Sequence, residues 1–323
     1  MVTEWLTRPP GAMDNDLRAA HVRQALHPFR PMAMMRTRGA VSEHGIMTFG
    51  GLRRPFVASA ITRRWAPACV VVLGALLAWA HATPAASENA EIAHRRAAER
   101  KSFTDAEIAD GFFKVTFGAE FHVAAGVDRI RKYEGPIRVY VDNRMQPDRS
   151  PQVAAVVADI RARIRDLDIT MTGKRDEAQV VVSLVRDRDL ARAIRALYGI
   201  DRARRIQRSL EPQCLSGFRK DENSRILRSD VLIVGDAGDF VFFDCIYEEL
   251  LQSIGPINDD TTVPWTMFND DVQMGFFDLY DQYLLNILYD RRIKPGMTRA
   301  QVKALLPEVL PQVRAWVDGN NKP

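Results

Sequence analysis

Histidine and cysteine are both scarce in this chain, and their scarcity limits its metal chemistry. Among 323 residues there are six histidines and three cysteines. Only His94 and His122, with Cys214 and Cys245, lie after residue 82. A catalytic zinc site of the protease type needs three protein ligands, and these are most often histidines. Two histidines cannot form a three-histidine site, so the sequence predicts no zinc site and no cofactor, with a hard cation held by oxygen ligands as the alternative.

The chain also lacks an apolar run of the length that ordinarily spans a membrane. Its apolar segment at residues 65–80, WAPACVVVLGALLAWA, is shorter than the roughly 20 residues that a spanning helix needs. Arg63 and Arg64 precede this segment, and Ala-His-Ala follows at 80–82. These three features are typical of a secretory signal peptide. We therefore expect residues 65–82 to direct export to the periplasm and to be cleaved, with an uncleaved membrane anchor as the alternative.

Residues 1–64 form an extension and charged region ahead of the apolar segment. Signal peptides normally begin close to their charged region, and a start at Met47 would give a more usual signal. The first residues then represent a mis-assigned start or a disordered extension. We expect no fold there.

No excess of charge of either sign remains once residues 1–82 are removed. That segment holds 10 of the 45 basic and 4 of the 41 acidic residues, which leaves 35 basic and 37 acidic residues in 83–323. Nucleic-acid binding needs concentrated positive charge. The sequence therefore predicts no nucleic-acid partner.

One short stretch is nevertheless rich in arginine, at Arg202, Arg204, Arg205 and Arg208. Such a run can be a binding patch or a solvated helix face. We interpret it as a solvated helix face, which is the commoner case.

The two cysteines after residue 82 are expected to pair in an oxidising periplasm. A Cys214–Cys245 disulfide would close a loop around residues 215–244 and stabilise the fold by roughly 3 kcal/mol. The alternative is two separately buried thiols. A nucleophilic cysteine is disfavoured because no histidine lies nearby in sequence to activate it.

Apolar periodicity after residue 82 predicts an α+β protein with a mixed sheet packed against helices. We expect a charged lead-in helix within 83–103 and one domain over 104–323 that ends in a helical appendage. Capping boxes mark two helix starts, at Thr104–Glu107 and Thr298–Gln301. The predicted strands are 136–141, 179–185 and 231–234. The predicted helices are 87–101, 188–210, 242–254 and 272–289, with others starting at 104, 150 and 298.

The segment EELLQSIGPIN, residues 248–258, can be aligned with the zinc-protease pattern H-E-x-x-H-x-x-G-x-x-H. It keeps the glutamate and the glycine but has Glu248, Gln252 and Asn258 at the three histidine positions. On a helix, positions 248 and 252 are one turn apart and can point at one spot. A carboxylate and two amides are poor ligands for zinc.

These side chains suit hydrogen bonding, or a hard cation helped by Asp259 and Asp260. Glu249 keeps the position of the general base. An ordinary amphipathic helix is the alternative. In both cases we expect the helix to have an apolar side and an opposite side that presents the polar residues. The apolar side has Phe243, Tyr247, Leu250 and Ile254, and the opposite side has Cys245, Glu248, Glu249 and Gln252.

Downstream of this segment, the chain resembles the metzincin class of zinc proteases. Met267, in the sequence PWTMF, lies where that class has its methionine turn, and a long helix follows as the third helix does there. The resemblance covers about 136–290 and implies a zincin-like fold whose metal ligands have been replaced. A methionine beside Trp265 and Phe268 is also commonly a core residue, which is the alternative for Met267.

Three blocks, CIYEELLQSIGPINDD, VPWTMFNDD and YDQYLLNILYDRRIKPGMT, also resemble an uncharacterised family of exported proteobacterial proteins, a domain of unknown function. The resemblance spans most of 105–317. It implies no activity.

We therefore expect an exported, non-catalytic pseudoprotease that binds a peptide or cell-envelope component in the former cleft, or serves as a scaffold. One alternative is a metallohydrolase with a non-standard metal site and Glu249 as general base. Another is a purely structural envelope protein. The residues expected at the cleft are Glu248, Glu249, Gln252, Asn258, Asp259 and Met267.

Overall fold

The computed structural model describes residues 88–118, 128–209, 213–256 and 258–322. The chain divides into two units, 1–84 and 85–323, and every described residue belongs to the second. The second unit has its own apolar core, and a domain with its own core can in principle fold independently. The expected signal peptide and N-terminal extension lie outside the described residues. No described helix is both long enough and apolar enough to cross a bilayer.

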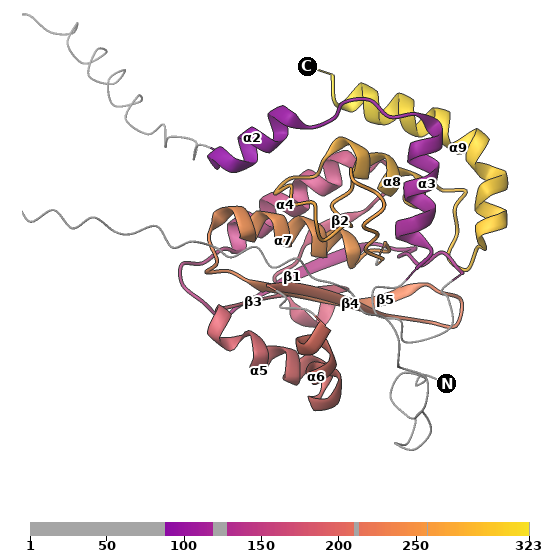
Figure 1. Cartoon of the computed structure of the whole chain (residues 1–323). Coiled ribbons are helices and arrows are strands. Elements are labelled where there is room, and N and C mark those ends of the chain that lie inside the picture. The colour runs from indigo at the N-terminus through magenta and orange to yellow at the C-terminus, as the bar shows by residue number, and fades with distance from the viewer. Residues whose placement is uncertain (1–87, 119–127, 210–212, 257, 323) are drawn as a thin grey trace, which may run out of the picture. The chain divides into compact units, whose positions relative to one another are not determined.

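A five-stranded mixed sheet forms the centre of the unit, in the order β2-β1-β3-β5-β4 (Figure 1). The strands β2, β1, β3 and β5 run parallel, and β4 lies antiparallel to β5 at one edge. The parallel strands are rich in Val, Ile and Leu because helices cover both faces of the sheet. The strands are β1 (Ile137–Asn143), β2 (Ile169–Met171), β3 (Val180–Val185), β4 (Cys214–Lys220) and β5 (Ile226–Val234).

Eight α-helices among the described residues are arranged around this sheet. A hairpin of α5 (Asp187–Tyr198) and α6 (Ile200–Ser209) covers one face, and the other helices lie on the opposite side (Figure 1). The fold is therefore α+β, as expected. The remaining helices are α2 (Ala90–Ala98), α3 (Asp105–Thr116), α4 (Ser150–Arg163), α7 (Asp239–Gln252), α8 (Leu279–Tyr289) and α9 (Arg299–Asn320).

Helix α8 is the most deeply buried element, since each of its residues is buried. Helices α3 and α9 pack against it and shield it from solvent. Both of these outer helices begin with the capping boxes that the sequence predicts, at Thr104–Glu107 and Thr298–Gln301. The appendage that starts at Thr298 thus completes the core around α8.

Three parts of the fold differ from the sequence prediction. The strands β2 and β4 were not expected, because β2 has three residues and β4 mixes small, polar and charged residues at the sheet edge. The predicted helix 188–210 is two helices that meet at Gly199, whose φ is +76°. The helix expected at 272–289 begins only at Leu279.

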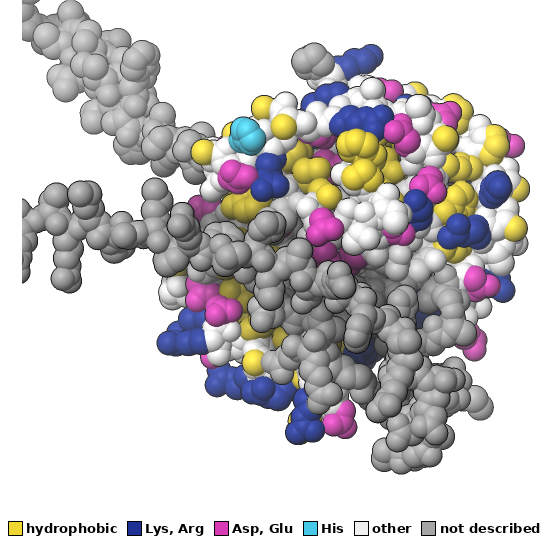
Figure 2. All heavy atoms as spheres, in the orientation of Figure 1, with side chains coloured by type: hydrophobic (Ala, Val, Ile, Leu, Met, Phe, Trp, Pro, Cys, Tyr) yellow, Lys and Arg dark blue, Asp and Glu magenta, His cyan; other side chains and the backbone are white. Residues whose placement is uncertain are grey.

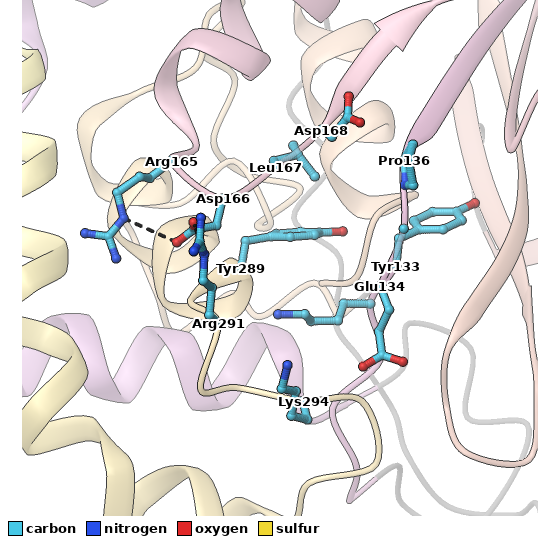
Figure 3. Close-up of a pocket in the computed structure, with 12 residues that line it drawn as sticks. Tyr133, Glu134, Pro136, Arg165, Asp166, Leu167, Asp168, Tyr289, Arg291 and Lys294 are labelled. Atoms are coloured by element: carbon cyan, nitrogen blue, oxygen red, sulfur yellow. Dashed lines mark hydrogen bonds and ion pairs between the residues drawn. The ribbon is translucent and has the colours of Figure 1, made fainter.

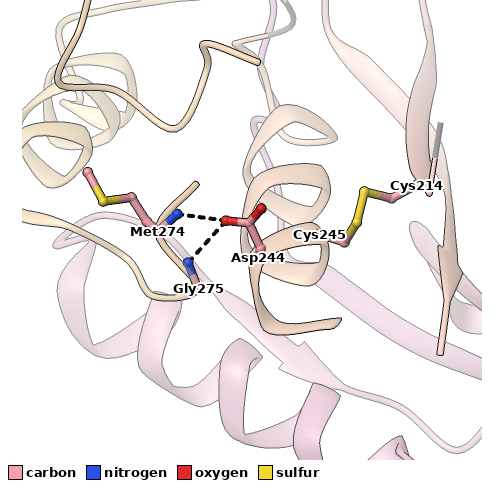
Figure 4. Close-up of a disulfide and its surroundings, with 5 residues drawn as sticks. All are labelled: Cys214, Asp244, Cys245, Met274 and Gly275. Carbon is pink, nitrogen blue, oxygen red and sulfur yellow. Dashed lines mark hydrogen bonds between the residues drawn. A yellow bond between two sulfur atoms is a disulfide. The ribbon is translucent and has the colours of Figure 1, made fainter. Parts of the chain in front are cut away.

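The predicted disulfide joins Cys214 on β4 to Cys245 on α7 (Figure 4). The two Cα atoms are 5.8 Å apart, and 31 positions separate the cysteines in sequence. The bond therefore ties the edge strand of the sheet to the helix that carries the EELLQ segment.

Replacing both cysteines by alanine is expected to lower the free energy of unfolding by about 3–4 kcal/mol, since the unfolded chain loses a closed loop of this length. Urea unfolding followed by circular dichroism measures the change. Reductant should destabilise the wild type by a similar amount and leave the double variant unaffected. A loss below about 1 kcal/mol would contradict this assignment.

Candidate functional site

Helix α7 forms the floor of the candidate site, and its apolar side packs towards the sheet. Phe242, Ile246 and Leu250 are fully buried and are spaced four residues apart, one turn after another. The helix packs against both β4 and β5. This packing fixes which carboxylates of α7 face the loop after it.

The expected division of α7 into one apolar and one polar side is wrong in part. Phe243 and Tyr247 are only half-buried, whereas Cys245 and Glu249 are buried. The reason is that α7 is covered on more than one side, by the sheet, by α4 and by the disulfide. Glu249, at 5% exposure, therefore belongs to the interior of the fold.

Asp244 fastens the loop before α8 to helix α7. Its Oδ1 accepts hydrogen bonds from the backbone N–H groups of Met274, at 2.7 Å, and Gly275, at 3.1 Å (Figure 4). Gly275 has a φ of +74°, and a Cβ there would lie 2.9 Å from Ile92 Cγ1 on α2. The glycine thus lets α2 pack onto this loop. Burial raises the pKa of Asp244.

Asp281 of α8 holds the turn that contains Met267. Its Oδ1 accepts the hydroxyl of Thr266 at 2.5 Å, and its Oδ2 accepts the N–H of Met267 at 2.7 Å. Met267 is 3% exposed and packs in the main core. Burial raises the pKa of Asp281 to about 6 and, with the charge of Asp281, raises that of neighbouring Asp278 as well.

Three carboxylates converge above α7 to form what we call the acidic cluster, Glu248, Asp259 and Asp270. One oxygen from each lies within 4.8 Å of the others. Glu248 and Asp259 are half-buried, and Asp270 is exposed. Gln252, one turn after Glu248, donates from Nε2 to Asp259 Oδ1 at 2.9 Å. The cluster thus lies where α7 is close to both ends of the loop segment 259–270.

The electrostatics of the acidic cluster disfavour three free negative charges. Burial, with the charge of Asp270 as the next cause, raises the pKa of Asp259 to about 7. Burial, then the charges of Glu249 and Asp259, raises the pKa of Glu248 well above its ordinary value. No ion pair between described residues involves any member of the cluster. The cluster therefore needs protons or a cation to offset its charge.

The structure brings together Glu248, Gln252 and Asp259 of the expected cleft and separates the other residues from them. Asn258 turns towards α3, where its Nδ2 donates to the carbonyl of Lys114 at 3.0 Å. Its own N–H bonds to the carbonyl of Val115. Asn258 therefore positions the chain and does not join the cluster.

Asp270 is the member of the cluster that the sequence did not indicate. The run Asn-Asp-Asp at 269–271 is typical of a turn, so the sequence alone predicts no site there. The sequence signal for Asp270 is weak, because no local pattern in a loop specifies which carboxylate faces Glu248, 22 positions earlier. Asp260 instead bonds within its own loop, to the N–H of Thr262 at 2.9 Å.

A separate cavity of about 430 Å³ lies where β1 and β2 begin and α8 ends (Figure 3). The ammonium of Lys132 points to the end of α8 and donates to the carbonyls of Leu288, Asp290 and Ile293 at 2.7, 3.3 and 2.8 Å. A positive charge is favourable at a helix C-terminus. Lys132 therefore caps α8, and no member of the acidic cluster lines this cavity.

The chain matches a known family. The model of DUF2927, a family described as a protein of unknown function, matches residues 105–308. This range includes all five strands, the disulfide and the acidic cluster. No curated protein and no solved structure matches the chain.

The anchoring role of Asp281 is tested by replacing it with alanine. The Thr266 hydroxyl and the Met267 N–H would lose their acceptor in the interior, so the free energy of unfolding should fall by about 2–4 kcal/mol. Urea unfolding at pH 7 measures this. Exposed Asp271 is the control, and its alanine variant should stay within about 0.5 kcal/mol of the wild type.

The stability of the wild type should also depend on pH through Asp281. Its pKa is about 6 when folded against an ordinary value of 3.8, so the folded chain binds more protons between these values. The contribution of Asp281 to the free energy of unfolding is therefore fully present below about pH 4, and it is lost as the pH rises to about 6. In unfolding curves from pH 4 to 7, the alanine variant should show a smaller decline; an equal decline would contradict this role.

Proposed function

This chain belongs to DUF2927, a family of proteins of unknown function, and on that premise we propose that its domain is a non-catalytic binding protein with a cation in its acidic cluster. The domain is exported to the periplasm and zincin-like, and it performs no zinc chemistry. Support for the zincin-like assignment comes from the order of its parts. The helix α7, a polar loop, the turn at Met267 and the buried helix α8 follow one another in the same order as in the metzincin class.

The convergence of three carboxylates that have no basic partner among the described residues carries the proposal. A hard cation such as Ca²⁺ takes oxygen ligands at about 2.3–2.6 Å, so two oxygens up to 4.8 Å apart can contact the same ion. Glu248, Asp259 and Asp270 offer oxygen ligands alone, and the Gln252 amide holds Asp259 in place. Zinc prefers nitrogen and sulfur, which this cluster lacks.

The position of the cluster indicates what the cation does. Asp259 and Asp270 lie at the two ends of the loop segment that contains the Met267 turn, and Glu248 lies on α7. A cation shared by the three would fasten both loop ends to the helix. We assign it the role of ordering the face that binds a peptide or cell-envelope component.

The burial of Glu249 favours binding over hydrolysis. A general base must reach the substrate or its water within hydrogen-bond distance. Glu249 is 5% exposed and faces the interior, whereas Glu248 faces the cluster. The residue at the expected position of the general base is therefore buried, which supports binding over hydrolysis.

Calcium titration of the unit 85–323 tests the proposal, with protein purified without chelator or histidine tag. We expect one ion per chain by calorimetry and by elemental analysis. Free calcium at 100 times its Kd should add about 2.7 kcal/mol to the free energy of unfolding. This increase should raise Tm by about 5–10 °C. Glu248→Gln should weaken binding at least tenfold, because it removes one charged ligand.

The matched control is Asp271→Asn, which removes one charge from the same loop outside the cluster. It should change the affinity by less than about threefold. Absence of calcium binding, or equal effects of the two variants, would contradict the cation site. Hydrolysis of a peptide substrate that is lost in Glu249→Gln would instead support a metallohydrolase.

A further inference from the structure

The α5–α6 hairpin forms a separate surface on the face of the sheet opposite to α7 (Figure 1). Gly199, with φ +76°, ends α5, and its N–H donates to the carbonyl of Arg195 at 3.0 Å. Its own carbonyl accepts the N–H of Ala203 at 3.0 Å, inside α6. The two helices therefore meet in a tight tip around residues 197–200.

The inner side of this hairpin is fully used in packing. Leu190 and Ile194 from α5 and Ala203 and Ile206 from α6 are buried in the smaller apolar cluster. That cluster includes Leu232 and Val234 of β5 and is separate from the main core. The hairpin is thus fixed to the sheet, and the side of α5 opposite to Leu190 and Ile194 is exposed.

Arginines dominate the outer side. Arg188, Arg192 and Arg195 are exposed and are spaced four and three residues apart, which places them on one side of α5, away from Leu190 and Ile194. Arg188 and Arg195 form no ion pair with another described residue. Figure 2 shows dark blue side chains gathered at the lower left, where Figure 1 places α5 and α6.

The charge of the hairpin contrasts with that of the rest of the unit. Residues 186–209 hold eight arginines and three aspartates, a net charge of +5. The whole of 83–323 has 35 basic and 37 acidic residues. Positive charge is therefore concentrated on this one element of a nearly neutral unit.

The tip of the hairpin adds apolar side chains to this charged surface. Leu197 is 39% exposed and Ile200 is 60% exposed, and only Leu227 joins them among the large exposed apolar side chains of the described residues. Tyr198 lies between them, with the Arg202 guanidinium 5.0 Å from its ring centroid. Apolar and aromatic side chains beside arginines are the composition of segments that lie at a membrane interface.

We propose that the α5–α6 hairpin docks the unit onto an anionic phospholipid surface. Leu197 and Ile200 enter the interface, and the arginines meet lipid phosphates. The positive charge of the hairpin favours an anionic partner. The apolar tip favours a bilayer over a nucleic acid, because a phosphate backbone offers no apolar contact for Leu197 and Ile200. Because α7 lies across the sheet, the acidic cluster would then face away from the membrane.

Vesicle co-sedimentation of the unit 85–323 tests this inference, which does not depend on the cation site. We expect binding to phosphatidylcholine vesicles that contain 30% phosphatidylglycerol, weak binding to pure phosphatidylcholine, and weaker binding at high salt. Arg188→Ala with Arg195→Ala should weaken binding roughly 10- to 30-fold, at about fivefold for each charge. Leu197→Ser with Ile200→Ser should weaken it at least tenfold.

The matched control is Arg161→Ala with Lys303→Ala, which removes the same charge from exposed positions of α4 and α9 on the other side of the sheet. Its binding should equal that of the wild type, and thermal melts should show all variants folded. Equal binding to both kinds of vesicle, no binding, or equal loss in the control would overturn the inference. A further outcome is that only the arginine variant loses vesicle binding and that DNA or a polyacidic peptide competes with the vesicles. This outcome would also overturn the membrane inference, because it would assign the surface to an acidic polymer.

Discussion

The packing of α7 against the sheet is the constraint on which the rest of this structure depends. Phe242, Ile246 and Leu250 bury one side of the helix, and the disulfide at Cys245 fastens it to the edge strand β4. Because this packing fixes the position and rotation of the helix, it also determines which loops its carboxylates face. Asp244 receives the loop before α8, and Glu248 meets the two ends of the segment 259–270. The candidate site is thus a consequence of how one helix is held.

Two groups of carboxylates in this fold, one buried at Asp281 and one partly exposed in the acidic cluster, differ in the donors that the protein supplies to them. Asp281 accepts a hydroxyl and a backbone N–H within the core, so the protein itself satisfies its charge. The acidic cluster receives only the amide of Gln252 among the hydrogen bonds between described residues. Burial first, and then neighbouring negative charges, raise the pKa values of Glu248 and Asp259. Carboxylates that the fold supplies with donors anchor a turn. Carboxylates that it gathers without a basic partner suit an ion from outside.

The sequence predicted the elements whose signals are local. Both capping boxes, the apolar strands β1, β3 and β5, and the pairing of the two cysteines follow from short patterns or from simple counts. It failed where tertiary contacts decide. Periodicity treats a helix as having one buried side, so it placed Glu249 on the polar face, although α7 is covered on several sides. Asp270 joins Glu248 through a loop path that no local pattern encodes, and β4 is a strand mainly because β5 pairs with it.

The most direct test of the central claim is a crystal structure of the unit 85–323 grown with calcium. The account predicts one peak of ion density between Glu248, Asp259 and Asp270, about 2.3–2.6 Å from an oxygen of each. It also predicts that the loop ends remain on α7 as they are here. Carboxylates that separate from one another, or that pair with a basic side chain while calcium is present, would contradict the account.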